Sequence, residues 1–267
     1  MNKANIAFIV EGEAREPVVI RNMQSFFFKK NQIKIITLPA GQNIYMLWKK
    51  LKDDDFETDI IEVLRESSPE SEQALRGLSR ENFSEIYLFF DYDGHQANLK
   101  EGTDSQKVLA EMLGNFNNET DNGKLYISYP MVEALRDLAV DGCAGYTKCE
   151  IGKEEFHNYK NISAANARMA RFERYEIDHW EEVLEVFALR VSCLFGKESV
   201  LSFQEYRDNV NPNSIFEKQM RIQEGQSVFI LSAFPEFLFD YQREAFWRSK
   251  VKKTHNQRMM CNKRSGA

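Results

Sequence analysis

The stretch EIYLFFDYDG, residues 85–94, decides the fold class of this chain. Its first six residues are mostly apolar and of strand length, which is typical of a strand buried on both faces. The run ends abruptly in Asp91, Tyr92, Asp93 and Gly94. Asp91 and Asp93 are two residues apart, so in extended backbone their side chains point to the same side. One predicted strand therefore delivers two carboxylates to one end of a sheet.

An earlier strand of the same kind, Ile6 to Val10, also ends in acidic residues, the string EGEAREP at 11–17. Gly12 leaves room for a tight turn from this strand into a helix. In open α/β sheets, ligands gather beyond the carboxyl ends of the strands. Carboxylates crowded there repel one another unless a cation lies between them, and such oxygen ligands suit Mg²⁺ or Mn²⁺. The sequence predicts a divalent-metal site formed by Glu11, Asp91 and Asp93.

Strand-like and helix-like segments alternate over residues 1–140, which predicts an α/β domain with a parallel sheet flanked by helices. The segment from Ser67 to Ser71 reads as a loop within a polar stretch. Further strands are expected at Ile33–Leu38 and Lys124–Ser128, and helices at Asn43–Lys52, at Asp59–Glu66, after Asp104 or Ser105, and from about Pro130.

Residues 141–247 predict a mainly α-helical region, and 248–267 a basic C-terminal tail. From Ala245 onward there is no acidic residue but there are seven basic ones, which suit phosphate contacts or a solvated terminus. Beside this run we expect Phe246 to be buried, whereas the sequence does not decide whether Trp247 is buried or exposed. Helices are expected at Ala164–Phe195 with a turn near Tyr175 to Asp178, at Ser214–Gln223 and at Phe234–Lys250, with Val228–Leu231 as an alternative strand.

The composition describes an ordinary globular chain of 267 residues, 43% hydrophobic, with a formal net charge of −6. No basic field covers the whole molecule, and no apolar run approaches the roughly 20 residues that span a bilayer. The four cysteines form no CxxC pair and the chain begins without a signal-peptide pattern. We therefore expect a cytoplasmic protein with reduced thiols and no membrane partner.

The strings IVEGEAREP and YLFFDYDG resemble the Toprim fold shared by topoisomerases, DnaG-type primases and overcoming-lysogenization-defect nucleases. That family places a Glu after its first strand and an Asp-x-Asp after its third, which correspond here to Glu11, Asp91 and Asp93. The string EGEAREP is similar to RloB-like proteins of bacterial restriction and anti-phage loci, which adds Glu13 and Glu16. The string YPMVEALRD, residues 129–137, resembles a segment of AriB-like anti-phage effectors, which adds Glu133.

The resemblance covers roughly residues 5–140 and implies a Toprim-like Rossmannoid sheet and a Mg²⁺- or Mn²⁺-dependent endonuclease. Its substrate would be DNA or RNA, with tRNA suggested by analogy, and its role an effector of anti-phage defence. The chain has no Gly-x-x-x-x-Gly-Lys-Ser/Thr loop, so nucleotide-driven control would come from a separate ATPase or sensor protein. A second copy of the chain is a further candidate partner.

Among the implied site residues, Glu11, Asp91 and Asp93 would hold the metal, Glu16 would complete the shell, and Glu133 would join them in catalysis. Glu13 and Glu133 have the alternative of being solvated helix residues. Lys148 and Lys153 are candidate phosphate contacts, and His95 a candidate proton donor, with solvated loop positions as the alternative.

Three other interpretations of these residues stay open from the sequence alone: a purely structural role, a binding module and a different enzymatic reaction. The acidic groups at 11–16 also favour a helix N-terminus, and Asp91 and Asp93 also suit a turn, without any metal. A non-catalytic module would use the acidic rim for a structural cation or a basic partner. Primase-like nucleotidyl transfer is the third, although no zinc-binding or helicase segment accompanies it.

Overall fold

The computed structural model describes residues 5–28, 34–40, 44–92, 104–138, 149–197, 199–222 and 226–251. The chain divides into two compact units, Met1–Tyr126 and Ile127–Ala267. In the part of the chain that the structure describes, no helix has the length and apolarity needed to cross a membrane.

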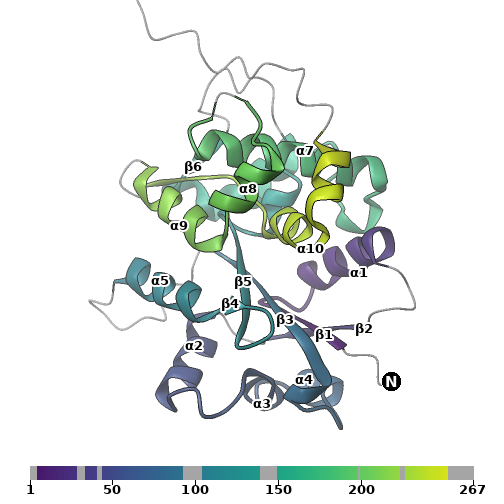
Figure 1. Cartoon of the computed structure of the whole chain (residues 1–267), viewed down its shortest axis with the longest axis vertical. Coiled ribbons are helices and arrows are strands. Elements are labelled where there is room, and N and C mark those ends of the chain that lie inside the picture. The colour runs from purple at the N-terminus through teal and green to yellow at the C-terminus, as the bar shows by residue number, and fades with distance from the viewer. Residues whose placement is uncertain are drawn as a thin grey trace, which may run out of the picture. The chain divides into compact units, whose positions relative to one another are not determined.

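The first unit is built on a five-stranded, mostly parallel sheet with the strand order β2-β1-β3-β5-β4 (Figure 1). β1 pairs in parallel with both β2 and β3, and the two-residue β4 pairs antiparallel with β5. The strands are β1 (Asn5–Val10), β2 (Lys34–Pro39), β3 (Phe83–Asp91), β4 (Asn117–Asn118) and β5 (Gly123–Ser128).

Helices flank this sheet, with α1 on one side of the strands and α2 to α4 on the other (Figure 1). All six residues of β1 are buried because both faces of the central strand are covered. The predicted α/β class is therefore confirmed. The helices are α1 (Arg15–Phe27), α2 (Ile44–Asp53), α3 (Ile60–Arg65), α4 (Pro69–Ala74) and α5 (Ser105–Asn115), with a 3-10 turn, η1, at Arg80–Asn82.

The predicted loop at Ser67–Ser71 is wrong, because α4 begins inside it. The Ser68 hydroxyl accepts from the backbone N–H of Ser71, and Pro69 occupies the first helical turn. Serine as a cap and proline at the first turn are helix-start signals as well as loop signals. The same capping logic confirms Asp104, whose carboxylate accepts from the N–H groups of Gln106 and Lys107 at the start of α5.

The second unit is mainly helical, as expected, with a small antiparallel pair of strands, β6 and β7. The apolar stripe predicted for the long helix is buried along α7, from Trp180 to Val191. The elements are η3 (Val132–Leu135), β6 (Glu150–Gly152), η5 (Lys153–Asn158), α6 (Tyr159–Asn166), η6 (Phe172–Arg174), α7 (Ile177–Leu194), α8 (Phe203–Asn209), α9 (Pro212–Arg221), β7 (Ser227–Phe229) and α10 (Ala233–Lys250).

Two helix predictions in this region differ from the structure. The segment after Pro130 forms the short 3-10 helix η3, not an α-helix. The turn expected near Tyr175 to Asp178 lies at the start of α7, but the break begins earlier than predicted, because α6 already ends at Asn166. Within this break the Ala170 carbonyl accepts from Arg136. The same Arg136 also donates to Ser163 and to the Lys160 carbonyl. These hydrogen bonds from a residue distant in sequence outweigh the local helix propensity of the segment.

At the end of α10 the expected burial of Phe246 is wrong, and the structure settles the position of Trp247, which was left undecided. Trp247 is buried, and its ring contacts Tyr206 of α8 and Phe239 within α10, whereas Phe246 is half-buried. The helix α8 that supplies Tyr206 was not anticipated from the sequence, because its seven residues carry one buried side chain.

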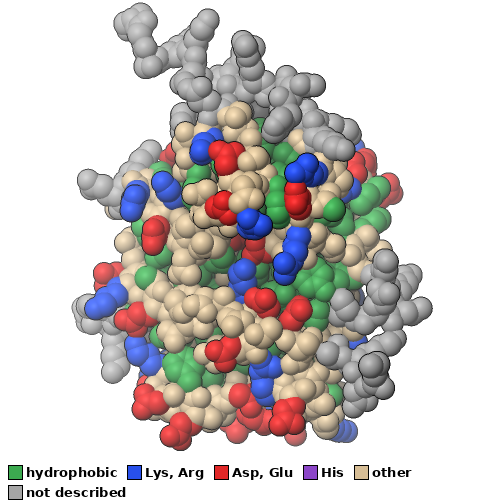
Figure 2. Space-filling view, viewed as in Figure 1, with side chains coloured by type: hydrophobic (Ala, Val, Ile, Leu, Met, Phe, Trp, Pro, Cys, Tyr) green, Lys and Arg blue, Asp and Glu red, His purple; other side chains and the backbone are tan. Residues whose placement is uncertain are grey.

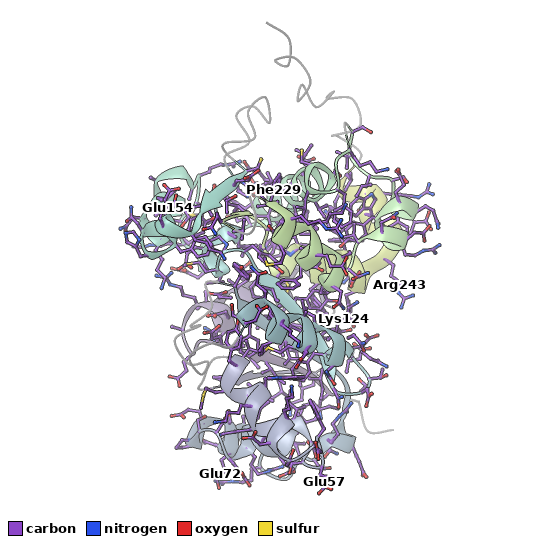
Figure 3. The ribbon with its side chains drawn as sticks, turned by 90° about the vertical axis from the view of Figure 1, so that its left-hand side faces the viewer. Glu57, Glu72, Lys124, Glu154, Phe229 and Arg243 are labelled. Atoms are coloured by element: carbon purple, nitrogen blue, oxygen red, sulfur yellow. The ribbon has the colours of Figure 1, made fainter. Side chains whose placement is uncertain are left out.

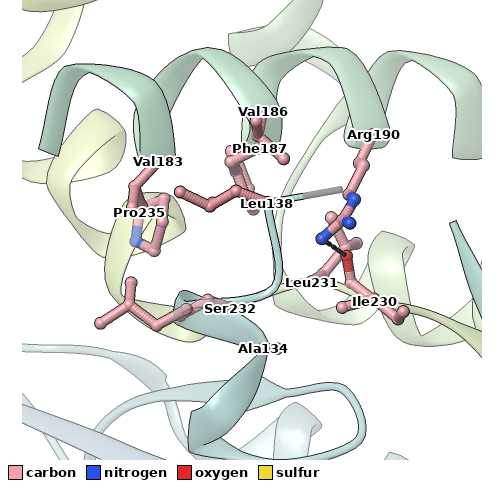
Figure 4. Close-up of a pocket in the computed structure, with 11 residues that line it drawn as sticks. Ala134, Leu138, Val183, Val186, Phe187, Arg190, Ile230, Leu231, Ser232 and Pro235 are labelled. Atoms are coloured by element: carbon pink, nitrogen blue, oxygen red, sulfur yellow. Dashed lines mark hydrogen bonds between the residues drawn. The ribbon is translucent and has the colours of Figure 1, made fainter. Parts of the chain in front are cut away.

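A buried ion pair lies in the core of the second unit. Arg190 of α7 is 2% exposed, and its Nη1 donates to the Ile230 carbonyl at 3.3 Å (Figure 4). Its Nη2 lies 3.7 Å from Oδ1 of Asp137, whose other oxygen accepts from the Tyr159 hydroxyl at 3.0 Å. The guanidinium stands among apolar side chains around a small cavity, so each charge depends on the other for compensation.

We expect Arg190→Met and Asp137→Asn each to lower the free energy of unfolding by about 3 to 5 kcal/mol, because each leaves a buried charge without its partner. The double variant should lose clearly less than the sum of the two. Urea unfolding followed by the fluorescence of buried Trp180 and Trp247 measures this. Additive losses would contradict the coupling.

Arg243 is strained within α10, with φ of 63° and ψ of −155°, a region that suits glycine. Its side chain is exposed and points away from the body of the unit (Figure 3). We expect Arg243→Gly to raise the free energy of unfolding by about 1 kcal/mol, because it relieves this strain. Arg243→Ala, which keeps a Cβ atom but removes the charge, is the control and should not stabilise the protein.

Candidate functional site

Three neighbouring strands end together at one edge of the sheet, which we call the carboxyl edge. The register aligns Val10 of β1 with Pro39 of β2 and with Phe89 of β3. The backbone N–H of Ala40 donates to the Val10 carbonyl at 2.8 Å, which ties the segment after β2 to the end of β1. Residues that follow β1, β2 and β3 therefore lie close together in space.

The topological switch point of the sheet lies at this edge. The chain runs from β1 to β2 on one side and then crosses to β3 on the other, so connections leave β1 and β3 in opposite directions. A crevice opens between two such strands, and ligands of open α/β sheets bind there. Glu11 follows β1 and Asp91 ends β3, so both predicted residues flank that position.

Glu11 and Asp91 are within hydrogen-bonding distance of each other. The backbone N–H of Asp91 donates to Oε2 of Glu11 at 3.3 Å, although 80 positions separate the two in sequence. Both side chains are half-buried, so they have contact with solvent and with the protein interior at once. Asp93, the third predicted ligand, lies outside the described residues.

Glu16 folds back over the turn between β1 and α1. It is 7% exposed, and its Oε1 accepts from the backbone N–H of Gly12 at 3.3 Å. A Cβ atom on Gly12 would stand 2.7 Å from Oε2 of Glu16. A Cβ atom here would push the end of this flexible side chain aside, so glycine allows the Glu16 carboxylate to lie over the turn. The structure thus brings Glu16 beside Gly12, the residue that follows Glu11.

Two buried tyrosines belong to the same place, and sequence reasoning missed both. Tyr45, in the first turn of α2, is 5% exposed, and Tyr92, directly after β3, is 3% exposed. Burial, the nearby Tyr92 phenol and the Glu11 carboxylate raise the pKa of Tyr45 to about 12. Burial raises the pKa of Tyr92 to about 12 as well. The sequence offered one signal for Tyr92, which is its position between Asp91 and Asp93, and none for Tyr45.

The remaining candidates divide between the two units. Glu13 is exposed beside the carboxyl edge. Glu133 belongs to the second unit, where it is fully buried within η3, so its alternative reading as a solvated residue is wrong. Lys153, also in the second unit, has its pKa lowered by partial burial. His95 and Lys148 lie outside the described residues.

The side chains at the carboxyl edge are of the chemical type that binds a hard divalent cation. Glu11 and Asp91 supply carboxylate oxygens, which Mg²⁺ and Mn²⁺ prefer. Within the described ranges no group of three His, Cys, Asp or Glu side chains has metal-binding geometry. Two of the three predicted ligands can be placed, and they lie together.

Comparison of the chain with protein-family models, with curated proteins and with solved structures found no match. What the carboxyl edge can do therefore follows from the chemistry of Glu11, Asp91 and their neighbours.

We expect Gly12→Ala to displace the Glu16 carboxylate from the Gly12 N–H, at a cost of about 1 kcal/mol in the free energy of unfolding. The cost stays small because the displaced atoms end a flexible side chain. Gly114→Ala is the matched control: no heavy atom lies within 4 Å of its added Cβ, and in α5 it should stabilise the protein. Equal effects of the two substitutions in urea unfolding would count against a specific clash at Gly12.

Proposed function

We propose that this chain is a Toprim-like, Mg²⁺- or Mn²⁺-dependent nuclease that hydrolyses phosphodiester bonds of nucleic acid. The observation that supports this proposal most is the meeting of Glu11 with Asp91 at the switch point of the sheet. The resemblance of the two acidic strings to the Toprim pattern gives the same two residues. RNA and DNA substrates, tRNA included, and a role in anti-phage defence follow from the resemblance alone.

In this proposal Glu11, Asp91 and Asp93 hold the metal, and Glu16 shapes the turn that carries Glu11. When bound, the metal would supply electrostatic stabilisation of the phosphate and an activated water. The chain's own part is to bring the Glu11 carboxylate to the backbone of Asp91, so that two acidic residues share one edge of the sheet, which costs Coulomb energy without a cation nearby. The Asp91 N–H bond to Glu11 offsets part of that cost and fixes the carboxylate at the edge.

Charge on the first unit restricts where nucleic acid could approach. Between Asp53 and Glu81 there are ten acidic and three basic residues. Acidic side chains gather at the end of the unit formed by α2 to α4, where Glu57 and Glu72 point outward (Figures 2 and 3). Polyanions are repelled there. A nucleic acid would have to reach the carboxyl edge from another direction.

The same acidic face favours the second candidate function, a non-catalytic module that binds a cation or a basic partner. A separate ATPase or sensor protein and a second copy of the chain remain candidate partners in either case, in the cytoplasm. The predicted basic tail at 248–267 begins inside α10, which ends at Lys250, and its residues from Lys252 onward lie outside the described residues.

We expect purified protein to bind Mn²⁺ and to cleave nucleic acid in its presence. Glu11→Gln and Asp91→Asn, which keep the side-chain shape and remove the charge, should each reduce cleavage by more than about 100-fold, because each removes a proposed ligand. Isothermal titration with Mn²⁺ and a gel-based assay on DNA and RNA measure both effects.

Glu57→Gln is the control, since it removes an exposed carboxylate elsewhere in the same unit. It should leave metal affinity and cleavage unchanged. Chelation with EDTA should abolish cleavage, and circular dichroism should report folded variants. Undiminished cleavage by Glu11→Gln and Asp91→Asn would reject the nuclease proposal, and an absence of Mn²⁺ binding would favour the partner-binding module.

A further inference from the structure

A small cavity in the core of the second unit has two polar side chains in a lining that is otherwise apolar (Figure 4). Arg190 of α7 and Ser232, which directly precedes α10, both line it. Arg190 is 2% exposed and Ser232 is 5% exposed, so bulk solvent satisfies neither side chain. The apolar lining comes from η3 and the residue Leu138 after it, from α7, from the segment after β7 and from α10.

The guanidinium of Arg190 uses only one of its three nitrogens in a hydrogen bond. Its Nη1 donates to the Ile230 carbonyl at 3.3 Å, along the dashed line in Figure 4. Among the described residues, neither Nε nor Nη2 has a hydrogen-bond partner. Nη2 lies 3.7 Å from Oδ1 of Asp137, a distance that forms an ion pair but is too long for a direct hydrogen bond. Donors of Arg190 are therefore available to a bound molecule.

Ser232 is the N-cap residue of α10, yet its hydroxyl does not cap that helix. Serine at an N-cap normally accepts from a backbone N–H of the first turn, as Ser202 does from the N–H of Glu205 at the start of α8. In the part of the chain that the structure describes, Oγ of Ser232 has no hydrogen-bond partner at all. A buried hydroxyl without a partner is costly, so such groups are normally satisfied by the protein or by a bound molecule.

The size of the cavity limits what it can hold. The space open to the centre of a water-sized sphere is about 10 Å³, which is room for roughly one water molecule. A purely apolar cavity stays dry, whereas a buried water is held by about two to four polar partners. Arg190 offers donors, the Ser232 hydroxyl can donate or accept, and the Ile230 carbonyl has a second lone pair. Since Asp137 already balances the charge of Arg190, this set suits a neutral molecule that both donates and accepts.

We propose that this cavity binds one water molecule, which accepts from the guanidinium of Arg190 and forms a hydrogen bond with the Ser232 hydroxyl. The water connects α7 to the segment between β7 and α10, and it completes the hydrogen bonding of a buried arginine. The cavity is then a polar binding site within the core and not a defect of packing. This inference concerns the second unit alone and is independent of the proposed nuclease activity.

The test combines a crystal structure of the full chain with equilibrium unfolding in urea. We expect an electron-density peak within about 3 Å of both the Arg190 guanidinium and Oγ of Ser232. Ser232→Ala should weaken or remove this peak. It should also raise the equilibrium constant of unfolding about fivefold, because one hydrogen bond of ordinary strength is lost. Removal of a hydroxyl that had no partner would instead stabilise the protein, so a stabilised Ser232→Ala protein overturns the inference.

Ser192→Ala is the matched control. Ser192 of α7 is fully buried, but its hydroxyl donates to the Ala188 carbonyl and accepts from the Leu201 N–H. This variant should also unfold more readily, and it should leave the density peak beside Arg190 unchanged. Loss of the peak in both variants would mean that it does not depend on Ser232, and would overturn the inference.

Two treatments of the crystals distinguish water from other occupants. An anomalous signal at the peak after a bromide soak would identify an anion site, and xenon in the cavity after pressurisation would identify a dry apolar one. Either result, or an absence of density in the cavity, overturns the inference. A peak without bromide or xenon signal that depends on Ser232 supports it.

Discussion

Parallel pairing of β1 with β3 is the constraint on which the candidate site depends. It places the ends of two strands side by side although they are 80 positions apart, and the Asp91 N–H bond to Glu11 closes the junction. Like charges at that junction repel one another, so the sheet must be rigid enough to hold them. Burial of β1 on both faces supplies that rigidity.

The surroundings of this junction combine acidic groups with buried phenols. Glu16 is occupied by the Gly12 N–H, whereas Tyr45 and Tyr92 add hydroxyl groups that stay protonated at neutral pH. The junction thus places half-buried carboxylates next to buried phenols.

The second unit is organised around buried polar side chains. Its buried Arg190–Asp137 pair and the donors of Arg136 connect η3 to α6 and α7, and these contacts decide where helices stop. Such buried polar groups contribute specificity of arrangement, because each must find its partner in one geometry. The apolar stripe of α7 then packs around them.

Local pattern was enough to predict β1, β2, β3 and β5 of the first unit, its helices α1, α2, α3 and α5, and the position of the acidic strings at strand ends, because periodicity and capping act over a few residues. It was not enough for α4, for the break between α6 and α7, or for the burial of Glu133 and Trp247. Those depend on partners far along the chain, as does the presence of Tyr45 beside Glu11. The sequence by itself determined which residues end each strand, whereas only the tertiary structure decided which of them meet, since contact across the sheet requires the strand order and register.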